Sequence, residues 1–136
     1  MKTRVIVAAI VEKDGKYLFG KKAKDVPPYP NTWHILGGGV EEGETLTQAI
    51  ERELWEEGHI RVSDLEEINV AEDDELNKHG EMIHYIFHVF KTKYASGDVT
   101  PGDDIAELAW FSPSEFAAIP LNRPTVSLFK KIGWLP

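Results

Sequence analysis

Glutamates recur at helical spacing in the segment 45–57, on the side where a folded protein keeps its apolar residues. At about 100° of rotation per residue, a helix over Thr45–Glu57 aligns Leu46, Ile50 and Leu54 in one stripe. The acids that border this stripe within a single turn are Glu53, Glu56 and Glu57. A helix that only faces solvent carries its acids opposite its apolar residues. The segment therefore predicts an amphipathic helix whose buried edge concentrates negative charge.

Such a cluster of carboxylates needs a proton or a cation to offset its charge. Like charges three and four residues apart on a helix repel. Two unit charges about 4 Å apart cost roughly 1 kcal/mol in water and several times more in a partly dry cleft. Carboxylates and carbonyls are the ligands that Mg²⁺ and Mn²⁺ prefer. We therefore expect bound Mg²⁺, with Mn²⁺ as the alternative ion; a solvated acidic helix is the plainer reading.

A run of three glycines precedes the predicted helix. Gly37, Gly38 and Gly39 carry no Cβ atom, so their backbone can bend sharply and approach a ligand closely. A glycine loop that leads to a helix start is a candidate phosphate cradle, and a plain turn is the alternative. Thr45 and Gln48 fit a capping box, which supports a helix start at Thr45.

The segment from Gly38 to Ile60 closely resembles the signature of the Nudix (MutT-like) hydrolases. The family pattern is a glycine, five residues, a glutamate, seven residues, and then R-E-U-x-E-E-x-G-U, where U is a bulky apolar residue. The residues that match it in register are Gly38, Glu44, Arg52, Glu53, Leu54, Glu56, Glu57 and Ile60. One position departs from the pattern, because His59 stands where the family has glycine. Either Gly58 adopts the left-handed conformation one residue early or His59 adopts it, and we expect activity to survive.

The resemblance extends beyond this signature. The segment 33–38 is similar to the family's W-x-x-P-G-G lead-in, with Leu36 in place of proline, and the segment 106–111 is similar to its closing strand. The resemblance covers the whole chain and implies one Nudix domain over residues 1–136. It implies the Nudix fold, an α/β (α+β) architecture in which a mixed β-sheet is sandwiched between helices. The GGGVE lead-in and the C-terminal segment are most similar to bacterial nucleoside triphosphatases.

Periodicity and turn signals place the remaining elements. The segment 65–71 fits a strand or a loop, and the segment 72–80 predicts a polar loop. A hairpin turn at Asp14-Gly15 joins the first two strands. Helix starts are expected at Ser112-Pro113 and at Pro124 or Thr125, the second helix ending at Ile132. The predicted strands are 4–11, 16–21, 33–36, 82–91 and 105–111.

The resemblance implies a set of metal ligands. Those on the glycine run and the helix are the Gly38 carbonyl, Glu53, Glu56 and Glu57. Some family members take another acid from a later loop, where this chain offers Asp103, Asp104 and Glu107. Asp104 lies six residues before Trp110, where the family often has glutamate, and we assign it as the further ligand. Solvated turn acids are the alternative for this loop.

The resemblance also implies catalytic roles. Glu53 is the frequent family candidate for activating water, although relatives differ in which acid serves as the base. Arg52 can fork onto a neighbouring carboxylate and orient it. Glu44 is expected to anchor the loop before the helix through hydrogen bonds.

Several residues outside the signature are candidates for contact with a nucleotide. Lys22 matches a basic position that contacts phosphate in some relatives, and Arg4 can face the nucleotide from the first strand. Gly37 and Gly39 are expected to approach the phosphates. The aromatic candidates for stacking on a base are Trp33, Tyr85 and Phe87. Exposed cations and core aromatics are the alternatives for these residues.

Composition narrows the classes of partner. The formal net charge of −8 makes binding to a nucleic acid polymer unfavourable. No apolar stretch approaches the roughly 20 residues of a membrane span, and the apolar run 5–11 predicts a first strand rather than a signal peptide. The chain has no cysteine, which is compatible with a cytoplasmic location. Trp55 points away from the predicted core and hints at a homodimer.

These features predict a Mg²⁺-dependent pyrophosphohydrolase that cleaves a nucleoside triphosphate to a monophosphate and pyrophosphate. The substrate is then a small nucleotide, with a pyrimidine deoxynucleotide as the first guess. The alternative within the enzyme class is a hydrolase of another nucleoside diphosphate derivative, such as ADP-ribose. A non-catalytic nucleotide sensor on the same fold and a simple divalent-ion buffer are the alternatives outside it.

Overall fold

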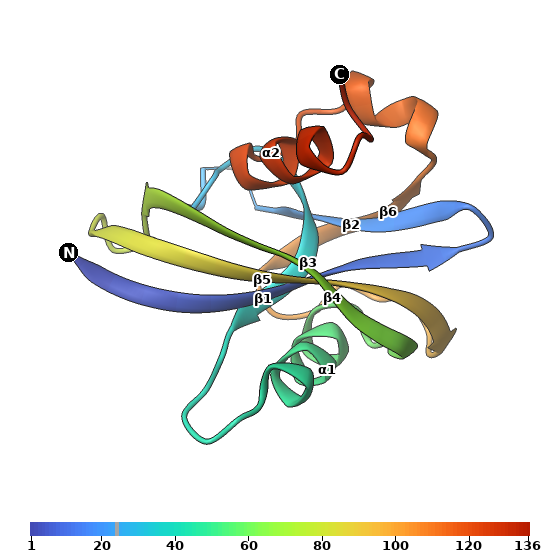
Figure 1. Ribbon diagram of the computed structural model, residues 1–136, viewed down its shortest axis with the longest axis horizontal. Helices are drawn as coiled ribbons and strands as arrows, with labels where there is room; N and C mark the ends of the chain where they lie inside the picture. The colour runs from blue at the N-terminus through green and yellow to red at the C-terminus, as the bar shows by residue number, and fades with distance from the viewer. Residues whose placement is uncertain (24) are drawn as a thin grey trace.

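The computed structural model describes residues 1–23 and 25–136, and their strands form a single mixed sheet (Figure 1). The sheet has six strands in the order β4-β5-β1-β3-β2-β6. The strands are β1 (Lys2–Lys13), β2 (Lys16–Lys22), β3 (Trp33–Gly39), β4 (Arg61–Leu76), β5 (Met82–Ser96) and β6 (Ile105–Phe111). The β1–β5 pair is parallel and the other pairs are antiparallel, so the predicted mixed sheet is confirmed.

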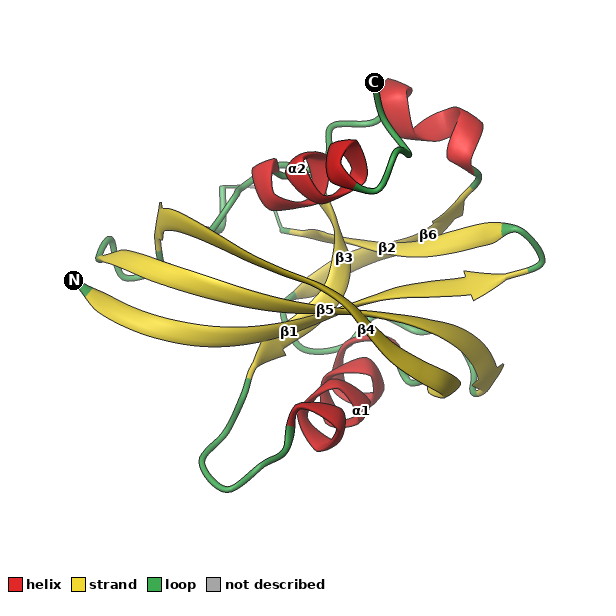
Figure 2. Cartoon of the chain, in the orientation of Figure 1, coloured by secondary structure: helices red, strands yellow, loops and turns green. Residues whose placement is uncertain are grey.

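Helices cover both faces of this sheet (Figure 2). They are α1 (Leu46–Gly58), the 3₁₀ helix η1 (Pro113–Ala118) and α2 (Arg123–Lys131). Figure 1 shows α1 on one face and α2 with η1 on the other, while β3 crosses steeply between the two halves of the sheet. The predicted sandwich of a sheet between helices is therefore confirmed. Neither α-helix of the described residues is long and apolar enough to cross a membrane.

Strand β1 lies at the centre of the sheet and is buried on both faces. Val7, Ala9 and Val11 pack into the core on the α1 side. Ala8 and Ile10 alternate with them and pack into the core on the α2 side. This two-sided burial explains the unbroken apolar run in the sequence, because a strand covered on both faces does not alternate with polar residues.

The α2 side is filled by rings. Five side chains, which we call the aromatic cluster, lie with neighbouring ring centroids 4.7 to 6.0 Å apart. They are Tyr17, Phe19, Phe116, Phe129 and Trp134. Tilted and edge-to-face rings at these separations attract each other beyond the area that they bury.

Strand β4 corrects one expectation. The polar loop expected over 72–80 is wrong for its first part, because β4 pairs with β5 up to Leu76 and only a short turn follows. The charged side chains of this stretch find partners: Nδ1 of His84 lies 2.6 Å from Asp74, and Nε2 lies 2.8 Å from Glu72. A strand at the edge of the sheet can carry such charges, because one of its sides is open to water.

Two further boundaries bear on the site. The glycine run is part of β3 and pairs with β1 in the register Gly37↔Ala8 and Gly38↔Val7. The helix expected at Ser112 is a 3₁₀ helix, and α2 begins at Arg123, one residue before the expected proline. The side chain of Asn122 caps α2 by accepting a hydrogen bond from the amide of Thr125, 2.9 Å away.

Candidate active site

Helix α1 is held at both ends, which fixes the spacing of its acids. At its start the predicted capping box is present: the amide of Gln48 donates to Thr45 Oγ1 at 3.1 Å, and Gln48 Oε1 accepts from the amide of Thr45 at 2.9 Å. At its end His59, rather than Gly58, adopts the left-handed conformation, with φ 57°. The amide of His59 donates to the Trp55 carbonyl at 2.9 Å. The last turn is therefore intact.

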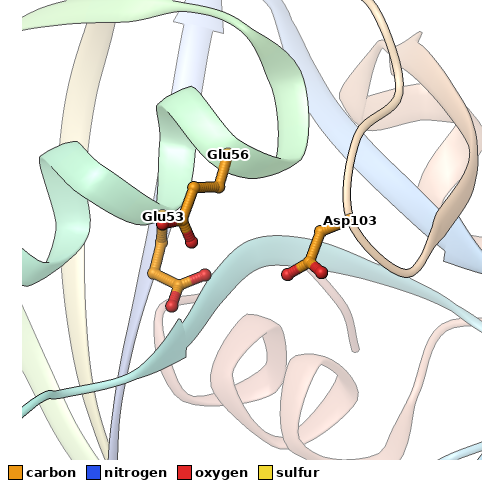
Figure 3. Close-up of side chains that lie close together, drawn as sticks. All are labelled: Glu53, Glu56 and Asp103. Carbon is orange, nitrogen blue, oxygen red and sulfur yellow. The ribbon is translucent and has the colours of Figure 1, made fainter.

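Two acids of α1 meet a third acid from the loop before β6 (Figure 3). Glu53, Glu56 and Asp103 each offer a carboxylate oxygen, and these oxygens all lie within 4.8 Å of one another. Figure 3 shows the two glutamates leaving α1 and Asp103 facing them from the opposite loop. We call these residues the acid triad. Three hard oxygen donors at this separation fit a divalent cation of the Mg²⁺ or Mn²⁺ type.

The loop that carries Asp103 is tied to the end of α1. The amide of Thr100 donates to the Gly58 carbonyl at 3.1 Å, and that of Gly102 donates to the Glu57 carbonyl at 3.0 Å. A Cβ atom on Gly102 would lie 2.2 Å from a backbone oxygen of the helix, so only glycine permits this approach. Asp103 then turns in the left-handed region, with φ 52°, and its carboxylate reaches the helix acids.

This geometry brings Asp103 to the acids where the sequence favoured its neighbour. Asp104 lines the adjoining cavity rather than joining the triad. The physical reason is the left-handed turn at Asp103, which the spacing from Trp110 could not register. Glu107, the third candidate, lies on β6 opposite Lys21 of β2.

The fourth acid of the signature, Glu57, lies beneath the glycine run. It is 8% exposed and accepts a hydrogen bond from the amide of Gly37 at 2.8 Å. Burial raises the pKa of Glu57 to about 8; repulsion from Glu53 and Asp103 adds to the rise, and the Gly37 hydrogen bond opposes it. Burial also raises the pKa of Glu53, against the attraction of Arg52. Ionised carboxylates here are therefore costly unless a cation shares the site.

Arg52 holds the acids and the preceding loop together. Its Nε and Nη2 atoms donate to the two carboxylate oxygens of Glu44 at 2.7 and 2.9 Å. Its Nη1 atom donates to Glu53 at 2.8 Å and to Glu56 at 3.1 Å. Nη2 also donates to the Gly39 carbonyl at 2.9 Å. This pairing lowers the pKa of Glu44 to about 2, and the forked geometry is the one expected for an orienting arginine.

The glycines of β3 let side chains touch the backbone. A Cβ atom on Gly38 would lie 2.4 Å from the carboxyl group of Glu53. A Cβ atom on Gly39 would lie 2.4 Å from the Nη2 atom of Arg4. Any larger residue would displace a candidate metal ligand at the first position and a candidate phosphate contact at the second.

A cavity of about 430 Å³ opens beside these residues. Its lining includes acids, the glycine run and apolar side chains such as Phe87 and Leu128. Cations line it too, namely Arg4, Lys22 and Lys78. Burial lowers the pKa of Lys22; nearby Glu57 and Asp104 oppose the shift, and Arg4 and Lys78 add to it. The cavity lining thus combines acids, cations and apolar side chains.

The structure places some of the other predicted nucleotide contacts in the cavity and others outside it. Tyr85 and Phe87 line the cavity. Trp33 lies elsewhere: its ring packs edge-on against Phe111, with centroids 5.2 Å apart, because its position on β3 directs it into the α2-side core. Sequence reasoning missed Lys78, which lies in the turn after β4, and His34 on β3. Neither residue belongs to the signature, and sequence periodicity does not indicate that a single polar side chain lines a cavity.

Comparison with known proteins finds a matching family model and named relatives. The NUDIX domain family model matches residues 1–131. Nucleoside triphosphatase NudI of Salmonella arizonae is 33% identical over 141 residues, covering 99% of this chain and 100% of that protein. NudI of Enterobacter sp. is 30% identical, also over 99% of this chain and 100% of that protein.

Solved structures show the same arrangement of elements. The MutT NUDIX hydrolase of Burkholderia pseudomallei superimposes with a TM-score of 0.77 at 24% identity, covering 96% of this chain and 98% of that chain. The E. coli ORF135 protein has a TM-score of 0.71 at 28% identity, covering 97% of this chain and 91% of that chain.

Proposed function

Because the chain belongs to the Nudix family of hydrolases, we propose that it cleaves a nucleoside triphosphate to a nucleoside monophosphate and pyrophosphate with the help of Mg²⁺. The acid triad beside the glycine run carries this proposal, because it offers oxygen ligands where a phosphate chain could approach the backbone. The relatives named nucleoside triphosphatase support the choice of a triphosphate.

The proposed ion site uses residues of two segments. Glu53, Glu56 and Asp103 would hold the ion, and Glu57, Asp104 and the Gly38 carbonyl are the further candidates. Mg²⁺, or Mn²⁺ in its place, supplies Lewis-acid chemistry when bound: it neutralises phosphate charge and acidifies water. The raised pKa values of Glu53 and Glu57 favour an ion here, since a cation removes the penalty of their charge.

The protein's own residues would then position the reaction. We assign Glu53 as the acceptor of the proton from the attacking water. Arg52 orients its carboxylate through the 2.8 Å hydrogen bond, and Glu44 fixes Arg52 in turn. Arg4 and Lys22 line the same cavity and would contact the phosphates, while Gly37 and Gly39 leave room for them. Positioning and charge stabilisation of this kind carry most of phosphoryl-transfer catalysis.

A panel of nucleotides tests the proposal. The protein is incubated with Mg²⁺ and ribo- and deoxyribonucleoside triphosphates, or with ADP-ribose, and the products are identified by mass. We expect pyrophosphate and a monophosphate from at least one triphosphate. Glu53→Gln should abolish most turnover while the protein stays folded. Cleavage of ADP-ribose alone, or nucleotide binding without products, would contradict the proposed reaction and favour the other hydrolase or the sensor.

Three properties of the whole molecule stay predictions: one domain over residues 1–136, a cytoplasmic location and a homodimer. Trp55 motivates the last. It is 42% exposed on α1, and the guanidinium of Arg61 lies 4.2 Å from its ring centroid. Light scattering at several concentrations checks the dimer, and Trp55→Ala should shift a dimer to the monomer mass.

A further inference from the structure

His34 lines the cavity and carries a hydrogen-bond acceptor without a partner. It lies on β3, and its Nδ1 atom is 2.8 Å from the carbonyl oxygen of Ile35. A carbonyl oxygen only accepts, so Nδ1 carries the ring proton and Nε2 is left with its lone pair. Nε2 is buried and has no hydrogen-bond partner among the residues that the structure describes. A buried polar atom without a partner is costly, which favours a ligand that completes it.

The charge state of His34 decides which ligand that can be. Burial lowers the pKa of His34 to about 4; the hydrogen bond to Ile35 opposes the shift, and the positive charge of Lys22 adds to it. The ring is therefore neutral at physiological pH. A phosphate oxygen offers lone pairs, as Nε2 does, so the two atoms repel each other. The complement of Nε2 is an N–H or O–H group.

The position of His34 agrees with this choice. Gly37 lies three positions further along β3, or about 10 Å away at the rise of a strand, and His34 lines the same cavity as Glu53 and Glu57. A second unpartnered polar atom, the hydroxyl of Tyr85, is buried on the wall of that cavity, and Tyr85 as a whole is 2% exposed. The cavity therefore holds unsatisfied uncharged groups as well as cations for phosphate.

We propose that Nε2 of His34 accepts a hydrogen bond from an N–H or O–H group of the nucleoside, which makes His34 a specificity-determining residue. The proposal rests on the proposed function, since it takes the nucleotide as the ligand. The donor has two chemical sources, an amino or imino group of the base or a hydroxyl of the ribose. An N–H or O–H donor in either part gives the same contact.

Single-donor analogues separate these sources. The best triphosphate substrate is compared with its 2′-deoxy and 2′,3′-dideoxy forms, and with the analogue methylated at each hydrogen-bearing base nitrogen. The proteins are wild type, His34→Phe, which keeps a ring and removes the acceptor, and His34→Gln, which retains an acceptor. His88→Phe is the matched control, because His88 lies on β5, pairs with Glu67 of β4 at 2.6 Å and is not among the residues that line the cavity.

We expect His34→Phe to lower kcat/KM for the parent nucleotide by about tenfold, mainly through KM, as expected for loss of one uncharged hydrogen bond in a buried site. One analogue should show the same loss with wild type and no further loss with His34→Phe. That analogue identifies the base or the ribose as the source. His34→Gln should restore part of the difference, and His88→Phe should match wild type.

Two results would overturn the proposal. An equal fall on the parent and on every analogue would mean that His34 only shapes the cavity. Equal kcat/KM values for wild type and His34→Phe would mean that Nε2 holds water alone. Calorimetric binding of the corresponding nucleoside monophosphates gives a second readout without turnover. If wild type cleaves no triphosphate, the proposed function fails, and the same analogue pattern in Kd still supports His34 as a nucleoside contact, whereas equal Kd values overturn that too.

Discussion

Both faces of the sheet bury an apolar core, but only the α1 face also buries carboxylates of the candidate site. On the α2 side the aromatic cluster buries rings against rings and leaves no charge among its five members. On the α1 side Glu53 and Glu57, which are 7% and 8% exposed, share the helix with Leu54 and Ile50. Both faces stabilise the protein by burying apolar area. The α1 face also gives up stability to hold carboxylates in place, and Arg52 offsets part of that cost.

The largest expected effect comes from a substitution on the α1 face. Glu57→Gln keeps the shape of the side chain and removes a candidate ligand, so turnover should fall by about 10²–10⁴-fold, the size of a general acid–base or electrostatic contribution. The melting temperature without metal at neutral pH should hold or rise, since burial of glutamine needs no proton uptake, whereas burial of Glu57 does. Steady-state kinetics with Mg²⁺ and thermal melts in EDTA check both. Glu51→Gln on the exposed side of α1 is the control, and equal turnover in the two variants would contradict the assignment.

The corresponding experiment on the α2 face removes one ring of the aromatic cluster. Phe129 is fully buried against Phe19, Phe116 and Trp134. Phe129→Ala should lower the free energy of unfolding by about 3–5 kcal/mol, because it removes ring contacts and leaves a cavity. The folded fraction should keep its turnover within an order of magnitude. Urea unfolding measures the first quantity, with the exposed Met82→Ala as the control. A loss of turnover without a loss of stability would contradict the assignment of the α2 face to stability alone.

The pH dependence of stability should show the cost of the buried carboxyl group on the α1 face. A carboxyl group with its pKa raised to about 8 keeps a proton in the folded state that the unfolded state releases above about 4.5. Its contribution to stability is therefore present at low pH and is lost as the pH rises through about 8. Metal-free wild type should lose on the order of a few kcal/mol relative to Glu57→Gln between pH 5 and pH 9. Urea titrations across this range test the difference, and parallel profiles for the two proteins would refute it.

A smaller effect is expected where Arg52 joins the two segments of the site. Arg52→Lys keeps the charge and loses the fork that holds Glu44 and Glu53. Affinity for Mn²⁺ should fall by about 10–100-fold, as for other partners that orient metal ligands. Calorimetry gives the affinity, and Arg61→Lys controls for the change of residue type. Unchanged affinity would mean that Arg52 only forms ion pairs and does not orient the candidate metal ligands.

The smallest effect concerns the end of α1. His59 is left-handed, a conformation that costs a non-glycine residue about 1 kcal/mol or more. His59→Gly should relieve that strain but lose the 2.9 Å contact between Nδ1 and the Thr100 carbonyl. The free energy of unfolding should therefore rise by up to about 1 kcal/mol, with kcat unchanged. Denaturation and kinetics on the same sample test this, and a clear fall in kcat would show that His59 supports the acids.

The contrast between the faces also explains what the sequence could predict. The acids of α1 were predictable because helical periodicity and the family signature agree on them. The role of Arg52 was predictable from the signature alone, since periodicity places it on the opposite face of the helix. The aromatic residues of the α2 side were predictable only as apolar residues, since their mutual contacts depend on how η1 and α2 pack.

Other features depended on contacts between distant segments. The strand at 72–76 was missed because its charges suggest a loop until Arg123 and His84 are placed beside them. Asp103 was passed over for Asp104 because the turn that aims it depends on Gly102 packing against α1. His34 carried no signal at all, since an unpartnered nitrogen exists only once the tautomer and the cavity are known.

The tie between the loop at 100–103 and the end of α1 has a consequence for folding. The donors of the acid triad come from segments far apart in the chain, and they meet where the loop at 100–103 is hydrogen-bonded to the end of α1. A nascent or truncated chain that ends before this loop would thus be a poor chelator. Ion binding of the proposed kind would then require the chain to be folded through Asp103.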